Sequence, residues 1–142
     1  MEIGIIGVGT MGSNIAILCA KAGLETLILD ANEENLNHGL ENIREFLSVG
    51  VSMGKLTLED KNSTEKCIQK VTSIQKLNHC DIVIEAITED QQTKNELFEN
   101  LNSITKEDTI FASNTSTLSI TKMGLHSGRP DKVVGTHFCL PA

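Results

Sequence analysis

A glycine-rich turn near the start of the chain is the first place where residue types and spacing could support chemistry. The run GVGTMG has the spacing GxGxxG and follows a short apolar segment. Gly7 permits a tight turn, Gly9 lets the backbone approach a pyrophosphate, and Gly12 lets a helix pack closely on a strand. The backbone amides that open the next helix, with Thr10 and Met11 among them, would hold the phosphates. This turn predicts a dinucleotide site.

Asp30 is a second candidate contact for the same dinucleotide. It follows Gly12 by eighteen residues and closes a second apolar run, TLIL. A carboxylate at the end of the second strand accepts hydrogen bonds from both ribose hydroxyls and repels a 2′-phosphate. No Arg follows Asp30 closely to reverse that preference. The sequence therefore predicts NAD, and not NADP, as the cofactor.

Short apolar runs alternate with helical patterns along the chain, and these elements must position the polar residues. Ile15, Leu18 and Ala22 recur at helical spacing after the glycine turn, and Gly23 ends that helix. The predicted strands are Glu2–Ile6, Glu25–Asp30, Val71–Ile74, Asp81–Ala86, Thr109–Ser113 and Lys132–His137. The predicted helices are Met11–Ala22, Ala31–Val49, Thr57–Gln69, Gln91–Ile104 and Leu118–Met123.

This order of elements predicts the fold. Strands joined by helical crossovers must be largely parallel, so we expect one α/β domain over residues 1–142. It would be a doubly wound, mostly parallel Rossmann sheet in the order 3-2-1-4-5-6, with helices on both faces. Ligands in this topology bind beyond the carboxyl ends of the strands. That rule selects the residues after Ile6, Ala86 and Ser113, and His137 itself.

Composition argues against several other classes of protein. Twelve Lys and Arg against nineteen Asp and Glu give a formal charge of −7, which does not suit nucleic-acid binding. Apolar runs such as Ile3–Ile6 are too short to span a membrane, and no secretion signal opens the chain, so we expect a cytoplasmic protein. The irregular spacing of Cys19, Cys67, Cys80 and Cys139 predicts no metal site, only reduced thiols that mostly fill the core.

Four later segments resemble those of a known enzyme family. They are IEAITED, KNELFENL, TIFASNTSTLSIT and VGTHF, which begin at residues 84, 94, 109 and 134. In this order and spacing they resemble the 3-hydroxyacyl-CoA dehydrogenases, a family that includes the 3-hydroxybutyryl-CoA enzymes. The resemblance covers Met1 to Ala142. It implies an acyl-CoA substrate in fatty-acid or butanoate metabolism, with an (S)-3-hydroxyacyl-CoA oxidised to the 3-ketoacyl-CoA and hydride transfer to NAD.

The resemblance also implies roles for individual residues. His137 matches the catalytic histidine, and an imidazole that titrates near neutral pH suits removal of the hydroxyl proton. Ser116 matches a residue that contacts both the substrate hydroxyl and the nicotinamide end, and Asn114 is a further substrate-binding candidate in the same loop. Glu89 and Lys94 match residues that line the nicotinamide-ribose side of the NAD site.

The chain departs from the family pattern at two points. The family continues Phe-Asn-Pro after VGTHF, whereas Cys139, Leu140 and Pro141 follow here, and Leu140 offers no donor near the reacting oxygen. The family's helical C-terminal domain, and the Glu that pairs with the histidine, are not among these 142 residues. We therefore expect NAD binding without appreciable turnover, and a homodimer only together with that domain.

Two other interpretations remain open. A related 3-hydroxy-acid dehydrogenase, such as a 3-hydroxyisobutyrate or lambda-crystallin-like enzyme, shares the glycine turn but does not explain SNTS followed by HF. A non-catalytic NAD-binding module would be consistent with Leu140 and the missing Glu. Single residues have plainer readings too: Ser116 as turn chemistry, Glu89 as a charge at a helix N-terminus, and Lys94 as a solvated charge.

Overall fold

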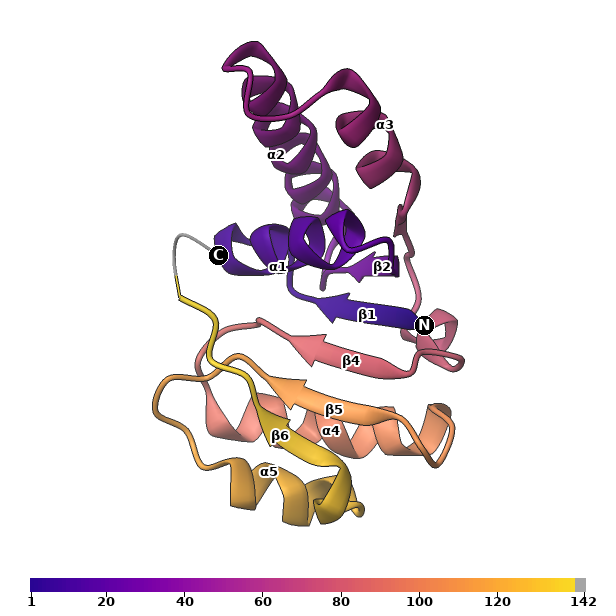
Figure 1. Cartoon of the computed structure of the whole chain (residues 1–142). Coiled ribbons are helices and arrows are strands. Elements are labelled where there is room, and N and C mark those ends of the chain that lie inside the picture. Colours follow the sequence, from indigo (N-terminus) through magenta and orange to yellow (C-terminus); the bar gives the residue numbers. More distant parts are fainter. Residues whose placement is uncertain (140–142) are drawn as a thin grey trace.

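Six parallel strands form a single sheet in the order β3-β2-β1-β4-β5-β6 (Figure 1). The computed structural model describes residues 1–139. In the centre of the sheet, Ile5 of β1 pairs with Ile28 of β2 on one side and with Ile84 of β4 on the other. The predicted doubly wound topology is confirmed. The strands are β1 (Glu2–Ile6), β2 (Glu25–Leu29), β3 (Ile68–Lys70), β4 (Ile82–Glu85), β5 (Ile110–Ser113) and β6 (Val133–Gly135).

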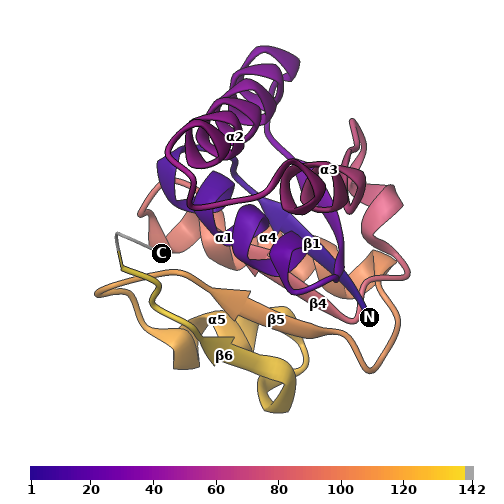
Figure 2. The same cartoon turned by 45° about the horizontal axis from the view of Figure 1, so that its top comes forward.

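Helices cover both faces of this sheet (Figures 1 and 2). The first three helices lie on one face, where α2 and α3 run side by side and extend beyond the sheet, and α4 and α5 lie on the other face. The helices are α1 (Thr10–Lys21), α2 (Glu33–Ser52), α3 (Leu58–Lys66), α4 (Gln91–Ile104) and α5 (Ile120–Ser127), with short 3-10 turns η1 (Ile74–Leu77) and η2 (Pro130–Lys132).

Alternating side chains along the strands explain why two apolar cores form. Ile3 and Ile5 of β1 pack with Ile15 of α1 on one face of the sheet. Val83 of β4 points the other way and packs with Phe98 of α4. Because successive strand residues face opposite sides, a sheet covered on both faces needs apolar residues at consecutive positions. Full burial of one apolar side chain such as Phe98 contributes about 1.5–3 kcal/mol to the stability of the fold.

The third strand lies earlier in the chain than predicted. It covers Ile68–Lys70, and the predicted segment Val71–Ile74 begins only after it. The amide of Val71 still donates to the carbonyl of Ile28, and the Val71 side chain is buried. The apolar character of Val71 therefore marks the residue that follows the strand and not its first residue.

Capping residues set two helix boundaries that differ from the prediction. Thr57 and Asp60 form a complete capping box, in which each side chain accepts a hydrogen bond from the other residue's amide. Helix α3 therefore starts directly after Thr57, but it ends before the predicted boundary. Ser119 caps α5, so this helix begins two residues later than predicted and continues to Ser127.

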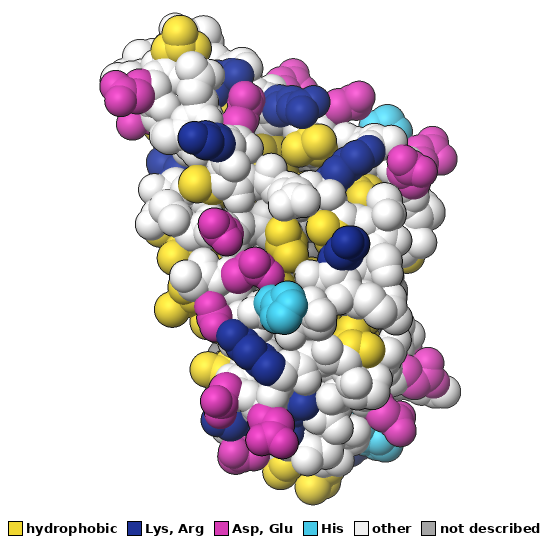
Figure 3. Space-filling view, turned by 90° about the vertical axis from the view of Figure 1, so that its right-hand side faces the viewer, with side chains coloured by type: hydrophobic (Ala, Val, Ile, Leu, Met, Phe, Trp, Pro, Cys, Tyr) yellow, Lys and Arg dark blue, Asp and Glu magenta, His cyan; other side chains and the backbone are white. Residues whose placement is uncertain are grey.

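The face at the amino ends of the strands is shown in Figure 3, where Lys and Arg side chains are interspersed with Asp and Glu. That face therefore has no stripe of a single charge sign. No helix in the described part of the chain is long and apolar enough to cross a membrane. Within residues 1–139, no group of three His, Cys, Asp or Glu side chains is placed as metal ligands would be.

Candidate functional site

Two glycines, one in the turn between β1 and α1 and one in the first turn of α1, occupy positions that leave no room for a side chain. Gly7 has a φ of +87°, and a Cβ there would lie 2.7 Å from the carbonyl oxygen of Ala86. A Cβ on Gly12 would lie 1.7 Å from the carbonyl oxygen of Gly7. Gly9 instead faces open space, and no side chain caps α1 there. The first amides of α1 are therefore available to an anion.

Asp30 lies beside this turn, directly after β2. Its Oδ2 accepts a hydrogen bond from the amide of Val8 at 2.9 Å, and its Oδ1 accepts from the amide of Ala31 at 2.8 Å and from Nδ2 of Asn35 at 3.1 Å. These bonds fix the carboxylate in a cleft of about 440 Å³ that extends from the glycine turn to α2 and to Ile87. The structure thus brings the glycine turn and Asp30 together, and we call this space the first cleft.

A second cleft, of about 680 Å³, continues along the same edge of the sheet. It adjoins the first cleft at Ala86 and Ile87, which line both. Residues that follow β5 and β6 form its other walls. The side chains that line the second cleft are Met11, Ala86, Ile87, Glu89, Asn114, Ser116, Thr117, His137, Phe138 and Cys139. Five of the predicted site residues therefore surround one space.

Ser116 and His137 are in contact at this second cleft. Oγ of Ser116 lies 3.1 Å from Nε2 of His137, within hydrogen-bond distance, and both residues are exposed. The histidine has a φ of +36°, which few residues other than glycine adopt. The amide of Phe138 donates to Oδ1 of Asn114 at 2.6 Å, which ties the segment after β6 to the loop after β5. Strained backbone of this kind is concentrated at functional sites.

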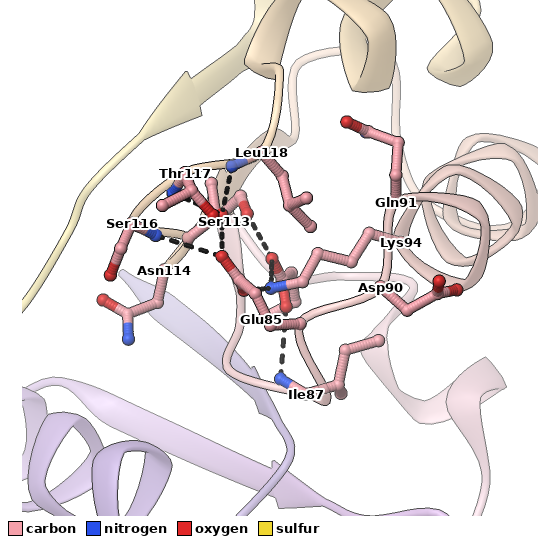
Figure 4. A network of polar contacts seen from close by, with 12 residues as sticks. Glu85, Ile87, Asp90, Gln91, Lys94, Ser113, Asn114, Ser116, Thr117 and Leu118 are labelled. Carbon is pink, nitrogen blue, oxygen red and sulfur yellow. Dashed lines mark hydrogen bonds and ion pairs between the residues drawn. The ribbon is translucent and has the colours of Figure 1, made fainter.

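A buried ionic network lies beneath the loop after β5 (Figure 4). Lys94 of α4 is fully buried, and its Nζ lies 2.9 Å from Oε1 of Glu85 and 3.0 Å from Oε2 of Glu89. Glu85 ends β4 and is also fully buried. It accepts further hydrogen bonds from the hydroxyl of Ser113 and from the amide of Ile87 at 3.1 Å. Buried charges are tolerated only when paired and hydrogen-bonded, and both conditions are met here.

Glu89 connects this network to the second cleft. Its carboxylate accepts hydrogen bonds from the hydroxyl of Thr115 and from the amide of Ser116 at 3.2 Å, in addition to its contact with Lys94. Burial alone would raise the pKa of Glu89, but the hydrogen bonds and the charge of Lys94 outweigh it and lower that pKa. Lys94 is fully buried, so it is not a solvated charge, and its ammonium contacts Glu89 behind the second cleft.

Comparison with known proteins identifies the family. The model of the 3-hydroxyacyl-CoA dehydrogenase, NAD binding domain, matches residues 2–142. The chain belongs to this family. The chain is 40% identical over 141 residues to a protein of Deinococcus radiodurans described as a probable 3-hydroxybutyryl-CoA dehydrogenase. That match covers 99% of this chain and 50% of the relative.

Solved structures of the 3-hydroxyacyl-CoA dehydrogenase family have the same fold. The (S)-3-hydroxybutyryl-CoA dehydrogenase of Ralstonia eutropha is 38% identical with a TM-score of 0.95, over 99% of this chain and 50% of that one. The 3-hydroxybutyryl-CoA dehydrogenase of Escherichia coli is 36% identical with a TM-score of 0.96, over 100% of this chain and 30% of that one. The chain spans about half the length of the first curated relatives. The predicted family and its NAD cofactor are confirmed.

Sequence patterns did not predict three residues that support the candidate site: Glu85, Ser113 and Thr115. One signal was available, since Glu85 directly follows the apolar run IVI and its carboxylate needs partners once that strand is buried. The hydroxyl of Thr115 also accepts hydrogen bonds from the amides of Thr117 and Leu118. Thr115 therefore organises the turn that carries the neighbouring serine.

The four cysteines of the chain differ in their surroundings. The four cysteines are free thiols, but only Cys80 is fully buried. Cys139 is not core filler, since it is exposed and its Sγ lies 3.9 Å from Nε2 of His137. His38 is among the residues that line the first cleft. The predicted departure at Leu140 lies outside the described residues.

Proposed function

We propose that the chain is the cofactor-binding half of an enzyme that oxidises an (S)-3-hydroxyacyl-CoA to the 3-ketoacyl-CoA. One observation carries this proposal: the 3.1 Å contact between Oγ of Ser116 and Nε2 of His137, in a cleft that adjoins the glycine turn and Asp30. Relatives described as 3-hydroxybutyryl-CoA and 3-hydroxyadipyl-CoA dehydrogenases support an acyl-CoA thioester as the substrate class.

The first cleft fits the adenosine and pyrophosphate part of NAD. A pyrophosphate that approaches Gly9 would meet no side chain there and would face the first amides of α1. Asp30 would accept the ribose hydroxyls and repel a 2′-phosphate, which favours NAD over NADP. The second cleft would then receive the nicotinamide end. When bound, NAD supplies the acceptor for the hydride.

The residues of the second cleft have separate tasks in this reaction. His137 would act as the general base that takes the proton from the 3-hydroxyl group, a role that contributes about 10²–10⁴-fold in many enzymes. Ser116 lies within hydrogen-bond distance of the same nitrogen and would hold the hydroxyl oxygen there. Asn114 already uses its Oδ1 for the amide of Phe138, so its Nδ2 is the atom left to contact substrate.

Calorimetric titration of the purified 142-residue chain tests the cofactor part of the proposal. We expect NAD and NADH to bind, and NADP to bind at least about tenfold more weakly, because Asp30 faces the ribose site. No heat of binding for either NAD or NADH, from material shown to be folded by circular dichroism, would overturn the proposal.

Amide chemical shifts measured by NMR test the substrate class. With NADH present, 3-hydroxybutyryl-CoA should shift the signals of Ser116 and His137, because both residues lie at the second cleft. Free 3-hydroxyisobutyrate should leave them unchanged. The opposite pattern would favour a dehydrogenase of short hydroxy acids.

A further inference from the structure

The network behind the second cleft pairs one ammonium with two carboxylates, so one negative charge is left uncompensated; Figure 4 shows Lys94 and Glu85 of this network. Lys94 contributes one ammonium, whose Nζ lies 2.9 Å from Oε1 of Glu85 and 3.0 Å from Oε2 of Glu89. Glu85 accepts three hydrogen bonds and its side chain is 0% exposed, whereas the Glu89 side chain is 42% exposed. The remaining charge is therefore presented to the cleft by Glu89.

No nearby cation in the lining of the second cleft offsets this charge. Among the lining residues that the structure describes, there is no Lys or Arg, and the titratable side chains are those of Glu89, His137 and Cys139. The imidazole of His137 is engaged with Ser116. The part of the cleft next to Glu89 is therefore electronegative.

We propose that Glu89 favours the oxidised form of the cofactor over the reduced form. This inference rests on the proposed function, because it assumes that the nicotinamide end occupies the second cleft. The nicotinamide ring is cationic when oxidised and neutral when reduced, so a fixed anion beside it stabilises the oxidised form alone. The consequence is weaker retention of NADH once a hydroxyl substrate has been oxidised.

Lys94 and Glu85 act through Glu89 as positioning residues. The hydroxyl of Thr115 and the amide of Ser116 hold the Glu89 carboxylate from the side of the loop, while Lys94 holds it from beneath. A carboxylate held by three donors does not turn away from the cleft or take up a proton near neutral pH, so its charge acts at a constant place. Because Glu89 is partly solvated, the expected effect on cofactor affinity is moderate, about three- to tenfold.

The experiment compares the dissociation constants of NAD and NADH, measured by calorimetry on the 142-residue chain and on two variants. Glu89→Gln removes the charge but keeps an acceptor oxygen for the amide of Ser116. Glu99→Gln is the matched control, because Glu99 is an exposed carboxylate on α4, the helix that follows Glu89, and lines neither cleft. We expect Glu89→Gln to shift the ratio of the two constants toward NADH about three- to tenfold, and Glu99→Gln to leave it within about twofold.

The outcomes separate this inference from the proposed function. If the unaltered chain binds neither form, the proposed function fails first. If it binds both, and Glu89→Gln weakens both affinities equally, the function stands but the charge effect is overturned. If Glu89→Gln does not fold, the salt dependence of the two dissociation constants, measured on the unaltered chain, tests the inference. Raising the salt concentration from roughly 0.05 to 0.5 M should reduce the preference for NAD, since both forms carry the same phosphates and only the ring charge differs. A ratio that does not respond to salt contradicts the inference.

Discussion

Some side chains at this site form a hydrogen bond within the protein and also face a cleft where a ligand would bind. Asp30 closes the glycine turn by accepting the amide of Val8, and the same carboxylate faces the cleft that would hold a ribose. Asn114 fixes the segment after β6 through its Oδ1 and keeps its Nδ2 for a ligand. Substitutions at such residues must therefore be compared with controls that report on folding.

Asp30→Asn should weaken NAD binding and narrow the gap between NAD and NADP. The amide retains one acceptor for Val8 but loses the charge that strengthens hydrogen bonds to ribose hydroxyls and repels a 2′-phosphate. We expect the Kd of NAD to rise about tenfold, a loss of about 1.4 kcal/mol, and the Kd of NADP to fall. Calorimetry with both cofactors measures this, with Asp131→Asn, an exposed residue outside both clefts, as the control. An unchanged ratio of the two constants would show that Asp30 does not face the ribose.

Two nearby glycines at the start of α1 should affect different properties: Gly12 the stability of the fold, and Gly9 the binding of NAD. A Cβ on Gly12 would meet the backbone of Gly7 at 1.7 Å, whereas a Cβ on Gly9 would meet nothing within 4 Å. We expect Gly12→Ala to lower the free energy of unfolding by about 3 kcal/mol or more, because backbone must move. Gly9→Ala should change it by less than about 1 kcal/mol and yet weaken NAD binding at least about tenfold, since its methyl group enters the phosphate site. Urea unfolding and calorimetry on both variants measure the two effects, and a stable Gly12→Ala chain would contradict the packing argument.

Strand β4 is tied to its neighbours by Asp81, and this bond makes stability depend on pH. The carboxylate of Asp81 accepts a hydrogen bond from the amide of Glu2 at 2.8 Å and pairs with the ammonium of Lys106. The hydrogen bond from Lys106, and then that from Glu2, lower the pKa of Asp81 from its ordinary value of 3.8. Because the folded pKa is the lower one, the stabilisation is present above the unfolded pKa and is lost as pH falls through the folded pKa.

Asp81→Asn should therefore lower the free energy of unfolding near neutral pH and flatten its decline below about pH 4. Urea unfolding at a series of pH values measures both effects. Asp131→Asn, which changes an exposed carboxylate without such partners in the described residues, should leave the profile unchanged. Parallel profiles for the unaltered chain and Asp81→Asn would rule out this contribution.

Local sequence patterns predicted most elements because strands buried on both faces consist of continuous apolar residues. The same patterns misplaced an element where few of its residues are apolar. Strand β3 lies at the sheet edge with Gln69 and Lys70 exposed, so its strongest apolar residue, Val71, lies just beyond it. The contact of Glu89 with Thr115 joins residues 26 positions apart, and no local spacing encodes it. Family motifs supplied the candidate site residues, whereas the bonds that hold them in place required the fold.

The domain places both clefts along one edge of its sheet, with the glycine turn at one end and the loops after β5 and β6 at the other. That order follows from the topology, since the two halves of a doubly wound sheet diverge between β1 and β4. A dinucleotide that spans this edge would pass Ala86 and Ile87, which line both spaces. The amide of Ile87 is held by buried Glu85, so the passage between the clefts is fixed by the same network that holds Glu89.

Exposure of the proposed catalytic residues, Ser116 and His137, limits the turnover that we expect of the 142 residues. Ser116 and His137 are both exposed, so water is not excluded from the place where a proton would move, and electrostatic interactions there are weak. We expect the chain to bind NADH, yet to reduce acetoacetyl-CoA far more slowly than the roughly 1–10³ s⁻¹ that is typical of enzymes. NADH fluorescence measures the binding, and loss of NADH absorbance measures the reaction. His137→Gln should keep the NADH affinity and abolish any slow residual turnover. A rate in the normal range that disappears in this variant would mean that the open cleft suffices for catalysis.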